Sequence, residues 1–232
     1  MSQSPVVEAP YEDHRVRVAR EKREKMRAHL LRSVMAVMSS DQSAGPRVID
    51  DVIRHAEVSR GTFYKYFGSL EQAVAELGAA LVEEMTAGID LLYDKVEDPR
   101  RRTATGFQLF LHRARTDRAW GGFVAHIGLL SPSNRMIRHM SADIQRGIDS
   151  GYYALPSVEC GLDLLVGTKI EAILRIIRGD RGRDYIEAMT AAVLRGFGCP
   201  PAEAQEIALS ESARVIALAP SQLEWWPAEE GR

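Results

Sequence analysis

The 232-residue sequence contains only two cysteines, Cys160 and Cys199, which are too few for a disulfide framework. No uninterrupted apolar stretch approaches the roughly 18 residues that a membrane-spanning helix needs. The N-terminus also lacks the basic start and apolar run of a signal peptide. We therefore expect two buried, inert thiols in a cytoplasmic protein that makes no membrane contact.

Motifs for catalysis and metal binding are missing as well. The six histidines form no paired ligand motif, and the chain has no Cys-x-x-Cys, no His-Glu-x-x-His and no glycine-rich phosphate loop. No nucleophile, base and orienting group stand at a workable spacing. We expect the protein to be neither an enzyme nor a carrier of a metal or cofactor.

The formal net charge of −2 argues against a general nucleic-acid binder, but the charges are unevenly distributed. Residues 14–70 hold 12 Lys and Arg against 6 Asp and Glu, whereas the remaining residues hold 18 against 26. A basic N-terminal part followed by an acidic remainder is typical of a protein that contacts DNA with one end only.

Residues 46–70, PRVIDDVIRHAEVSRGTFYKYFGSL, read as two short helices joined by a tight turn. Pro46 suits the first position of a helix, and Ile49, Val52, Ile53 and Ala56 follow at helical spacing on one face. After a break, Ser59 is a good N-cap for a second helix that begins at Arg60. This pattern predicts a helix-turn-helix, whose second helix enters the DNA major groove.

The second helix can bury Phe63 and Phe67, four residues apart, and leave polar side chains outside. Arginine and lysine neutralise phosphate, hydroxyl groups donate hydrogen bonds to it, and a glycine allows a close approach to the groove. The alternative is a helical hairpin that packs only against protein. The predicted DNA-binding residues are Ser59, Arg60, Gly61, Thr62, Tyr64, Lys65 and Tyr66.

The order of residues 59–67, SRGTFYKYF, closely resembles the recognition-helix signature of the tetracycline-repressor (TetR) family of bacterial regulators. The resemblance is specific from Met26 to about Leu77 and beyond that concerns architecture only. Two positions depart from the family pattern. Glu57 replaces the usual turn glycine, and Leu70 replaces a lysine that usually opens the fourth helix and contacts phosphate.

The rest of the chain predicts an all-α protein. Basic residues between Arg15 and Arg32 lead into a first helix, and those at its start could reach a phosphate. A long helix over residues 70–95 joins the DNA-binding part to a helical-bundle body, in which proline and glycine separate helices and no strand pattern occurs. We predict a tail at 1–13, a helix-turn-helix domain at 14–70, a ligand-binding and dimerisation domain at 71–218, and a C-terminal tail at 219–232 that is either loose or folded back through Trp225 and Trp226.

Two segments of the body predict a homodimer. Val158 to Arg178 carries an apolar stripe that is too wide for one neighbour, and residues 185–197 repeat the pattern. Burial within one subunit is the alternative. The resemblance implies dimerisation through these two helices, and a two-fold DNA site requires two copies.

The body also has the composition of a small-molecule pocket, because large apolar side chains stand among a few cationic ones. The simpler interpretation is that the aromatic residues are core and the charged residues surface. The resemblance places an effector site among these helices. The predicted ligand-binding residues are Phe107, Phe110, Arg113, Trp120, Phe123, His126, Met140 and Tyr152.

Together these patterns predict a ligand-responsive transcriptional repressor that binds a palindromic DNA operator as a homodimer and is released by a small-molecule effector. Flat aromatic walls beside an imidazole and a guanidinium favour an aromatic acid or a phenol. Two alternatives remain open: a DNA-binding regulator that answers a protein partner or no ligand, and a helical enzyme or scaffold with a vestigial DNA-binding head.

Overall fold

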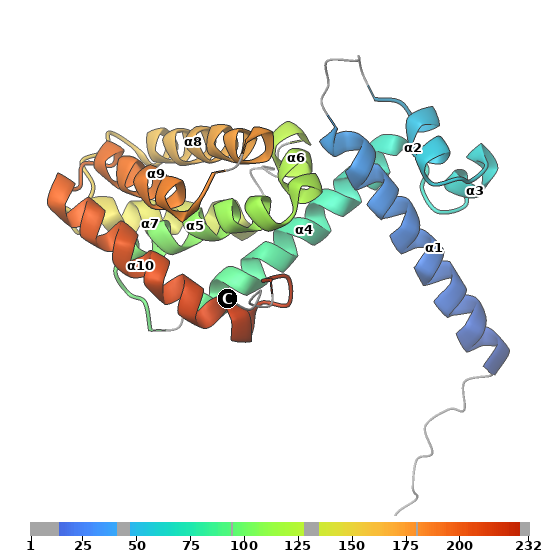
Figure 1. Ribbon diagram of the computed structural model, residues 1–232, viewed down its shortest axis with the longest axis horizontal. Helices are drawn as coiled ribbons and strands as arrows, with labels where there is room; N and C mark the ends of the chain where they lie inside the picture. Colours follow the sequence, from blue (N-terminus) through green and yellow to red (C-terminus); the bar gives the residue numbers. More distant parts are fainter. Residues whose placement is uncertain (1–13, 41–46, 94, 128–134, 180, 228–232) are drawn as a thin grey trace, which may run out of the picture.

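The computed structural model describes residues 14–40, 47–93, 95–127, 135–179 and 181–227. Within them the regular structure consists of ten α-helices and no strand, which confirms the all-α prediction (Figure 1). The helices are α1 (His14–Ser39), α2 (Ile49–His55), α3 (Arg60–Tyr64), α4 (Leu70–Leu92), α5 (Pro99–Thr116), α6 (Arg118–Ile127), α7 (Arg135–Asp149), α8 (Val158–Arg178), α9 (Arg183–Gly196) and α10 (Pro201–Gln222). None of the described helices is long and apolar enough to cross a membrane.

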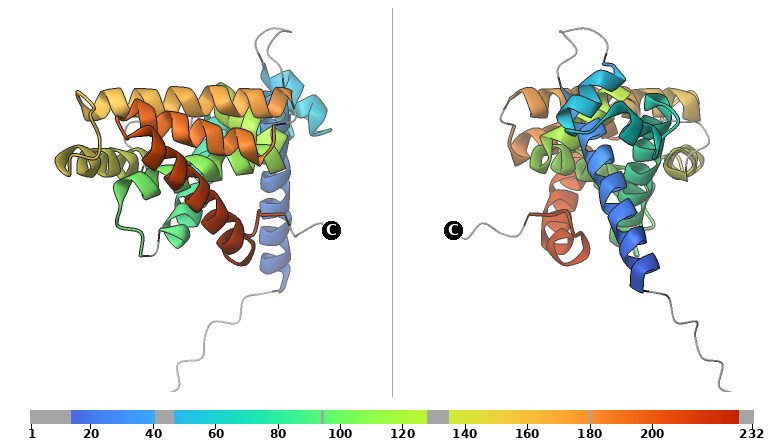
Figure 2. Two further views of the ribbon diagram at one scale, coloured as in Figure 1. Left: turned by 60° about the vertical axis from the view of Figure 1, so that its left-hand side comes forward. Right: turned by 90° about the vertical axis from the view of Figure 1, so that its right-hand side faces the viewer.

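The helices form a small head and a larger body. Helices α1 to α3 make the head, which lies at one end of the body formed by α5 to α10 (Figure 1, Figure 2). Helix α4 runs from the body into the head, and the N-terminal half of α1 extends beyond both (Figure 1). That half is almost entirely exposed, because its buried positions begin only at Leu30.

Short polar side chains fix where several helices begin. Each accepts a hydrogen bond from a backbone N–H of the first turn, which would otherwise have no partner. These caps are Ser59 with Thr62, Ser69 with Gln72, Asp98 with Arg100, and Ser157 with Cys160. Pro99 then occupies the first turn of α5, where its missing N–H costs nothing.

Helix α5 lies at the centre of the body and contacts α4 and each of α6 to α10. Two glycines bring α6 against its neighbours. A Cβ at Gly121 would meet a methyl of Ile177 on α8 at 2.9 Å, and one at Gly122 would meet the backbone oxygen of Ser39 at 2.6 Å. The end of α1 therefore rests directly on α6, which connects the head to the body at a second place besides α4.

The C-terminal segment is folded back on the body rather than loose, as far as residue 227, where the described residues end. Helix α10 continues to Gln222, and Leu223 is buried against Gly88 of α4. The ring of Trp226 lies 4.9 Å from that of His112, and Trp225 lies under the guanidinium of Arg113. This segment thereby packs on both α4 and α5.

Several predictions of detail need correction. Cys199 is buried, but Cys160 is exposed, because it occupies the outward face of the first turn of α8. The helix predicted over residues 70–95 ends at Leu92. The predicted tail at 1–13 and Pro46 lie outside the described residues. Helix α2 begins at Ile49, with Val48 at its N-cap.

Candidate functional site

The turn between α2 and α3 is a tightly hydrogen-bonded helix end. The N–H of Val58 donates to the carbonyl of Ile53 at 3.1 Å, and the N–H of Glu57 donates to that of Arg54 at 3.2 Å. This pair of bonds is the Schellman motif, which places the intervening residue in the left-handed conformation. Glu57 has φ of 53° and occupies that position without being a glycine. The turn therefore keeps its geometry at the cost of backbone strain.

Helix α3 separates its residues into a buried and an exposed face. Phe63 and Phe67 are 0% and 1% exposed, and their ring centroids lie 5.5 Å apart. The seven predicted DNA-binding residues come together on and beside this helix. Five of them are exposed and two half-buried: Ser59, Arg60, Gly61, Tyr64 and Lys65 in the first group, and Thr62 and Tyr66 in the second.

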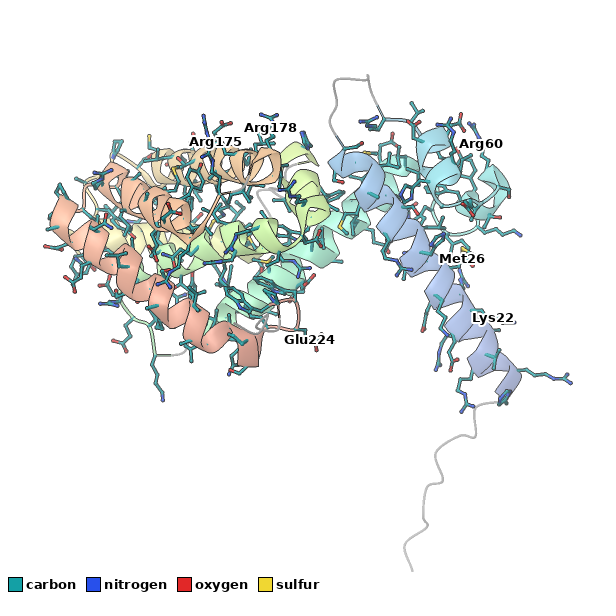
Figure 3. The ribbon with its side chains drawn as sticks, viewed as in Figure 1. Lys22, Met26, Arg60, Arg175, Arg178 and Glu224 are labelled. Atoms are coloured by element: carbon teal, nitrogen blue, oxygen red, sulfur yellow. The ribbon has the colours of Figure 1, made fainter. Side chains whose placement is uncertain are left out.

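The exposed face of α3 is open to an approaching molecule. A Cβ at Gly61 would meet nothing closer than the Ser59 Oγ at 3.8 Å. Arg60 points away from the body and pairs with Asp50 of α2 (Figure 3). Because both members of that pair are about half exposed, water screens it, and the guanidinium can exchange Asp50 for another anion at little cost.

A shallow hollow on the surface joins α1 to the end of α3. Lys22, Arg23 and Lys25 of α1 line it on one side, and Lys65 and Tyr66 line it on the other. Lys22 and Met26 stand on the part of α1 that leads out of the head (Figure 3). The sequence indicated that this helix is basic, but only the fold brings its lysines beside Lys65.

The body contains a pocket between α4, α5, α7 and α8. Its cavity volume is only ≈ 30 Å³. The pocket is therefore narrow, and its lining must move apart to admit even a small, flat molecule. Its lining residues are Thr86, Ile89, Tyr93, Thr103, Gly106, Phe107, Phe110, Met136, His139, Met140, Asp143, Leu165 and Lys169.

Two charged groups in this pocket differ in how they are compensated. The Asp143 carboxylate accepts from Arg102 Nε at 2.8 Å and also pairs with Arg146. Lys169 is 6% exposed, and its Nζ lies 4.1 Å from the centroid of the Phe110 ring and 3.6 Å from the Met140 sulfur. Burial lowers the pKa of Lys169 to about 8. Among the described residues, no carboxylate compensates the charge of its ammonium.

Residues 98–210 match the family model of the tetracyclin repressor-like C-terminal domain. The crystal structure of RolR with its ligand resorcinol is 28% identical to this chain, with a TM-score of 0.60 over 82% of this chain and 95% of RolR. The chain belongs to the TetR family of transcriptional regulators.

Two further relatives of this TetR-family protein show the fold alone. A tetR family transcription regulator from Shewanella sp. PV-4 is 16% identical, with a TM-score of 0.58 over 74% of this chain and 97% of that one. An ArpA-like gamma-butyrolactone receptor is 12% identical, with a TM-score of 0.53 over 83% and 98%. No curated protein matches the sequence.

Three of the eight residues predicted to bind ligand line the pocket of this TetR-family body: Phe107, Phe110 and Met140. The structure does not bring the other five to it. Trp120 and Phe123 are fully buried in the core, where the ring centroids of Trp120 and Phe110 lie 5.6 Å apart. In a helical bundle, aromatic residues that fill the core and aromatic residues that line a pocket recur at the same spacing. Periodicity in the sequence therefore cannot distinguish core residues from pocket residues.

The remaining three have partners elsewhere. Arg113 pairs with Glu84 of α4 at 3.3 Å, and the Nδ1 of His126 lies 2.7 Å from the carbonyl oxygen of Gly122. Tyr152 is exposed and stacks under the guanidinium of Arg100. Among the described residues, no three His, Cys, Asp or Glu side chains gather to hold a metal ion.

Sequence reasoning missed Lys169, although the sequence carried a signal for it. Lys169 stands four residues after Leu165 and four before Ile173, both of which are buried on the inner face of α8. A lysine within an apolar stripe at helical spacing must either snorkel outward or be buried. A buried lysine is rare unless it has a partner, so this position merited attention as a binding residue.

Proposed function

We propose that this TetR-family protein is a repressor that binds a two-fold DNA operator as a homodimer and releases it when a small aromatic acid or phenol occupies the body pocket. The observation that carries this proposal is the course of α4. This one helix supplies Thr86 and Ile89 to the pocket wall, as does Tyr93 directly after it, and packs Ala73 into the core of the head.

The DNA contact in this proposal is the exposed face of α3 together with the basic hollow beside it. Tyr64 is 49% exposed, and Lys65 follows it at the end of the helix. Tyrosine and lysine there would bind phosphates on both sides of the groove, while Arg60 and Thr62 at the start of the helix would contact base edges.

A double replacement tests the DNA contact. The duplex would be selected from a random pool by the purified protein, and binding would be measured by fluorescence anisotropy. We expect Tyr64→Ala with Lys65→Ala to weaken binding at least about tenfold, because phosphate contacts supply much of the affinity. The matched control is Tyr152→Ala with Lys95→Ala, which removes the same two side chains from exposed positions of the body. Equal affinities for the two double variants would contradict the assignment.

Dimerisation in this proposal uses the outward faces of α8 and α9. Leu164 on α8 is 38% exposed, and a Cβ added at Gly167 would meet nothing within 4 Å. Arg175 and Arg178 project from the same helix into solvent (Figure 3). By contrast, Ile173 is fully buried within the protomer, so a charge placed there would unfold the subunit rather than split a dimer.

Light scattering of charge-insertion variants tests the interface. Leu164→Glu should convert the dimer to a folded monomer, because two carboxylates would meet across a two-fold interface. Leu91→Glu is the matched control, since Leu91 is 52% exposed on α4, away from α8 and α9. A Leu164→Glu protein that remained dimeric would place the interface on another surface.

The effector part of the proposal rests on the shape and lining of the pocket. Phe107 and Phe110 offer flat apolar surfaces, and the narrow free space excludes bulky compounds. RolR, which shares 28% identity with this chain, holds the phenol resorcinol. A ligand can release DNA only through tighter binding to the state in which the heads no longer fit the operator. Movement of α4 would provide that state.

A panel of small aromatic compounds tests the effector by thermal shift and by release of bound DNA. Resorcinol, phenol and benzoate are the first probes. We expect at least one to raise the melting temperature and to release DNA. Phe107→Leu should weaken both effects, whereas Phe197→Leu, an equally buried phenylalanine outside the pocket lining, should not. Release that is unaffected by Phe107→Leu would place the effector elsewhere.

A further inference from the structure

The ammonium of Lys169 lies inside the body pocket without a carboxylate partner. Among the described residues its neighbours are the face of the Phe110 ring and the sulfur of Met140, and no ion pair joins it to Asp143, which lines the same pocket. A ring face and a thioether are weak partners for a group with three donors.

Among the described residues, the acidic groups around the pocket are paired with cations other than Lys169. Asp143 is the acidic group that lines the pocket, and it is already shared by Arg102 and Arg146. His139, at the edge of the pocket, faces Asp90 of α4 with the Nδ1 3.6 Å from a carboxylate oxygen. Of these groups, the Lys169 ammonium therefore remains available to an incoming anion.

We infer that the pocket takes a planar aromatic carboxylate, with the carboxylate bound to the Lys169 ammonium and the ring held against Phe107 and Phe110. This inference rests on the proposed function of the pocket and names the class of its ligand. A carboxylate supplies the opposite charge and strong acceptors that a buried ammonium lacks, whereas a neutral phenol supplies only a lone pair.

The ring part of the ligand follows from the rest of the lining. Met136 and Met140 are unbranched and can shift to widen the narrow space, and sulfur contacts favour an aromatic partner. An aliphatic acid would satisfy Lys169 but would leave the flat walls poorly filled. An aromatic amine would place a second positive charge beside the ammonium. At neutral pH most Lys169 side chains are charged, because their pKa is about 8.

Calorimetric titration of the full-length protein with benzoate and with its neutral isostere benzamide tests this inference at pH 7. We expect the wild type to bind benzoate about 10- to 100-fold more tightly than benzamide. In Lys169→Met, which keeps the side-chain volume, the two affinities should become equal. The melting temperature of this variant without ligand should be unchanged or higher, because an uncompensated buried charge is removed.

A second variant separates charge from hydrogen bonding. Lys169→Gln keeps donors at this position and should still lose the preference for benzoate. A preference that survived in both variants, or an absence of benzoate binding to the wild type, would overturn the inference. If resorcinol bound and released DNA while benzoate did neither, the proposed function of the pocket would stand, and only the inference that its ligand is a carboxylate would be refuted. If no arene bound, the effector proposal itself would fail.

Discussion

Replacing Glu57 by glycine should stabilise the protein, because Glu57 holds a left-handed backbone conformation with φ of 53°. This conformation costs a residue with a Cβ about 1–2 kcal/mol. Glycine avoids that cost but loses about 0.5–1 kcal/mol more conformational entropy on folding than other residues. The expected net gain in the free energy of unfolding is therefore about 0.5–1 kcal/mol. In a chain of this size, it corresponds to a rise in melting temperature of about 1–4 °C.

Scanning calorimetry with two further variants isolates the backbone effect. Glu57→Ala removes the same carboxylate but keeps the Cβ, so it should not stabilise the protein. Lys95→Gly should give a gain similar to Glu57→Gly, because Lys95 has φ of 61° and lies between α4 and α5, remote from the turn. Stabilisation by Glu57→Ala equal to that by Glu57→Gly would refute the argument, since the gain would then come from removing a negative charge.

Three other substitutions test features of the same fold. Gly122→Ala should lower the free energy of unfolding, measured by urea denaturation, by about 1–3 kcal/mol, because the new Cβ would meet the backbone oxygen of Ser39 at 2.6 Å. Gly61→Ala should not destabilise the protein, because a Cβ at Gly61 would have open space around it. Burial lowers the pKa of His112 to about 4, so on acidification the unfolded chain binds a proton at His112 before the folded protein does. The free energy of unfolding should therefore fall between pH 6.5 and pH 4, by up to about 1.4 kcal/mol per pH unit. His112→Phe should remove this contribution to the pH dependence. Replacing Lys22 and Lys25 together by alanine should reduce the dependence of log K on log salt for operator binding by about 1.8.

The features that the sequence predicted well are those set by neighbouring residues. The bounds of α8 follow from the Ser157 cap, the apolar stripe and Gly179 at its end, all of which act within a few residues. The start of α3 was likewise set by the capping Ser59, and Phe63 is its buried residue, although the helix ends at Tyr64 and Phe67 packs from beyond it. Local physical chemistry suffices for such elements.

The pocket depends on contacts between distant segments, and periodicity could not assign it. Phe110 and Phe123 are both large aromatic residues on neighbouring helices, yet only Phe110 borders free space. The difference arises because α6 packs against α1 and α8, which fills the surroundings of Phe123. Lys169 was not predicted as a pocket residue because the apolar stripe of α8 was interpreted through its hydrophobic residues alone.

In the proposed DNA contact, Leu70 stands where the resemblance leads us to expect a phosphate-binding lysine, so another helix would have to hold the DNA backbone. Leu70 is half-buried and packs against the core, so it offers no charge at the start of α4. Cations of α1 instead line the hollow beside Lys65. An ion pair between Arg27 and Glu76 joins α1 to α4. A displacement of α4 by a ligand would therefore act on α1 through this ion pair, while the end of α1 remains in contact with α6, and the two helices together would set the position of the recognition helix.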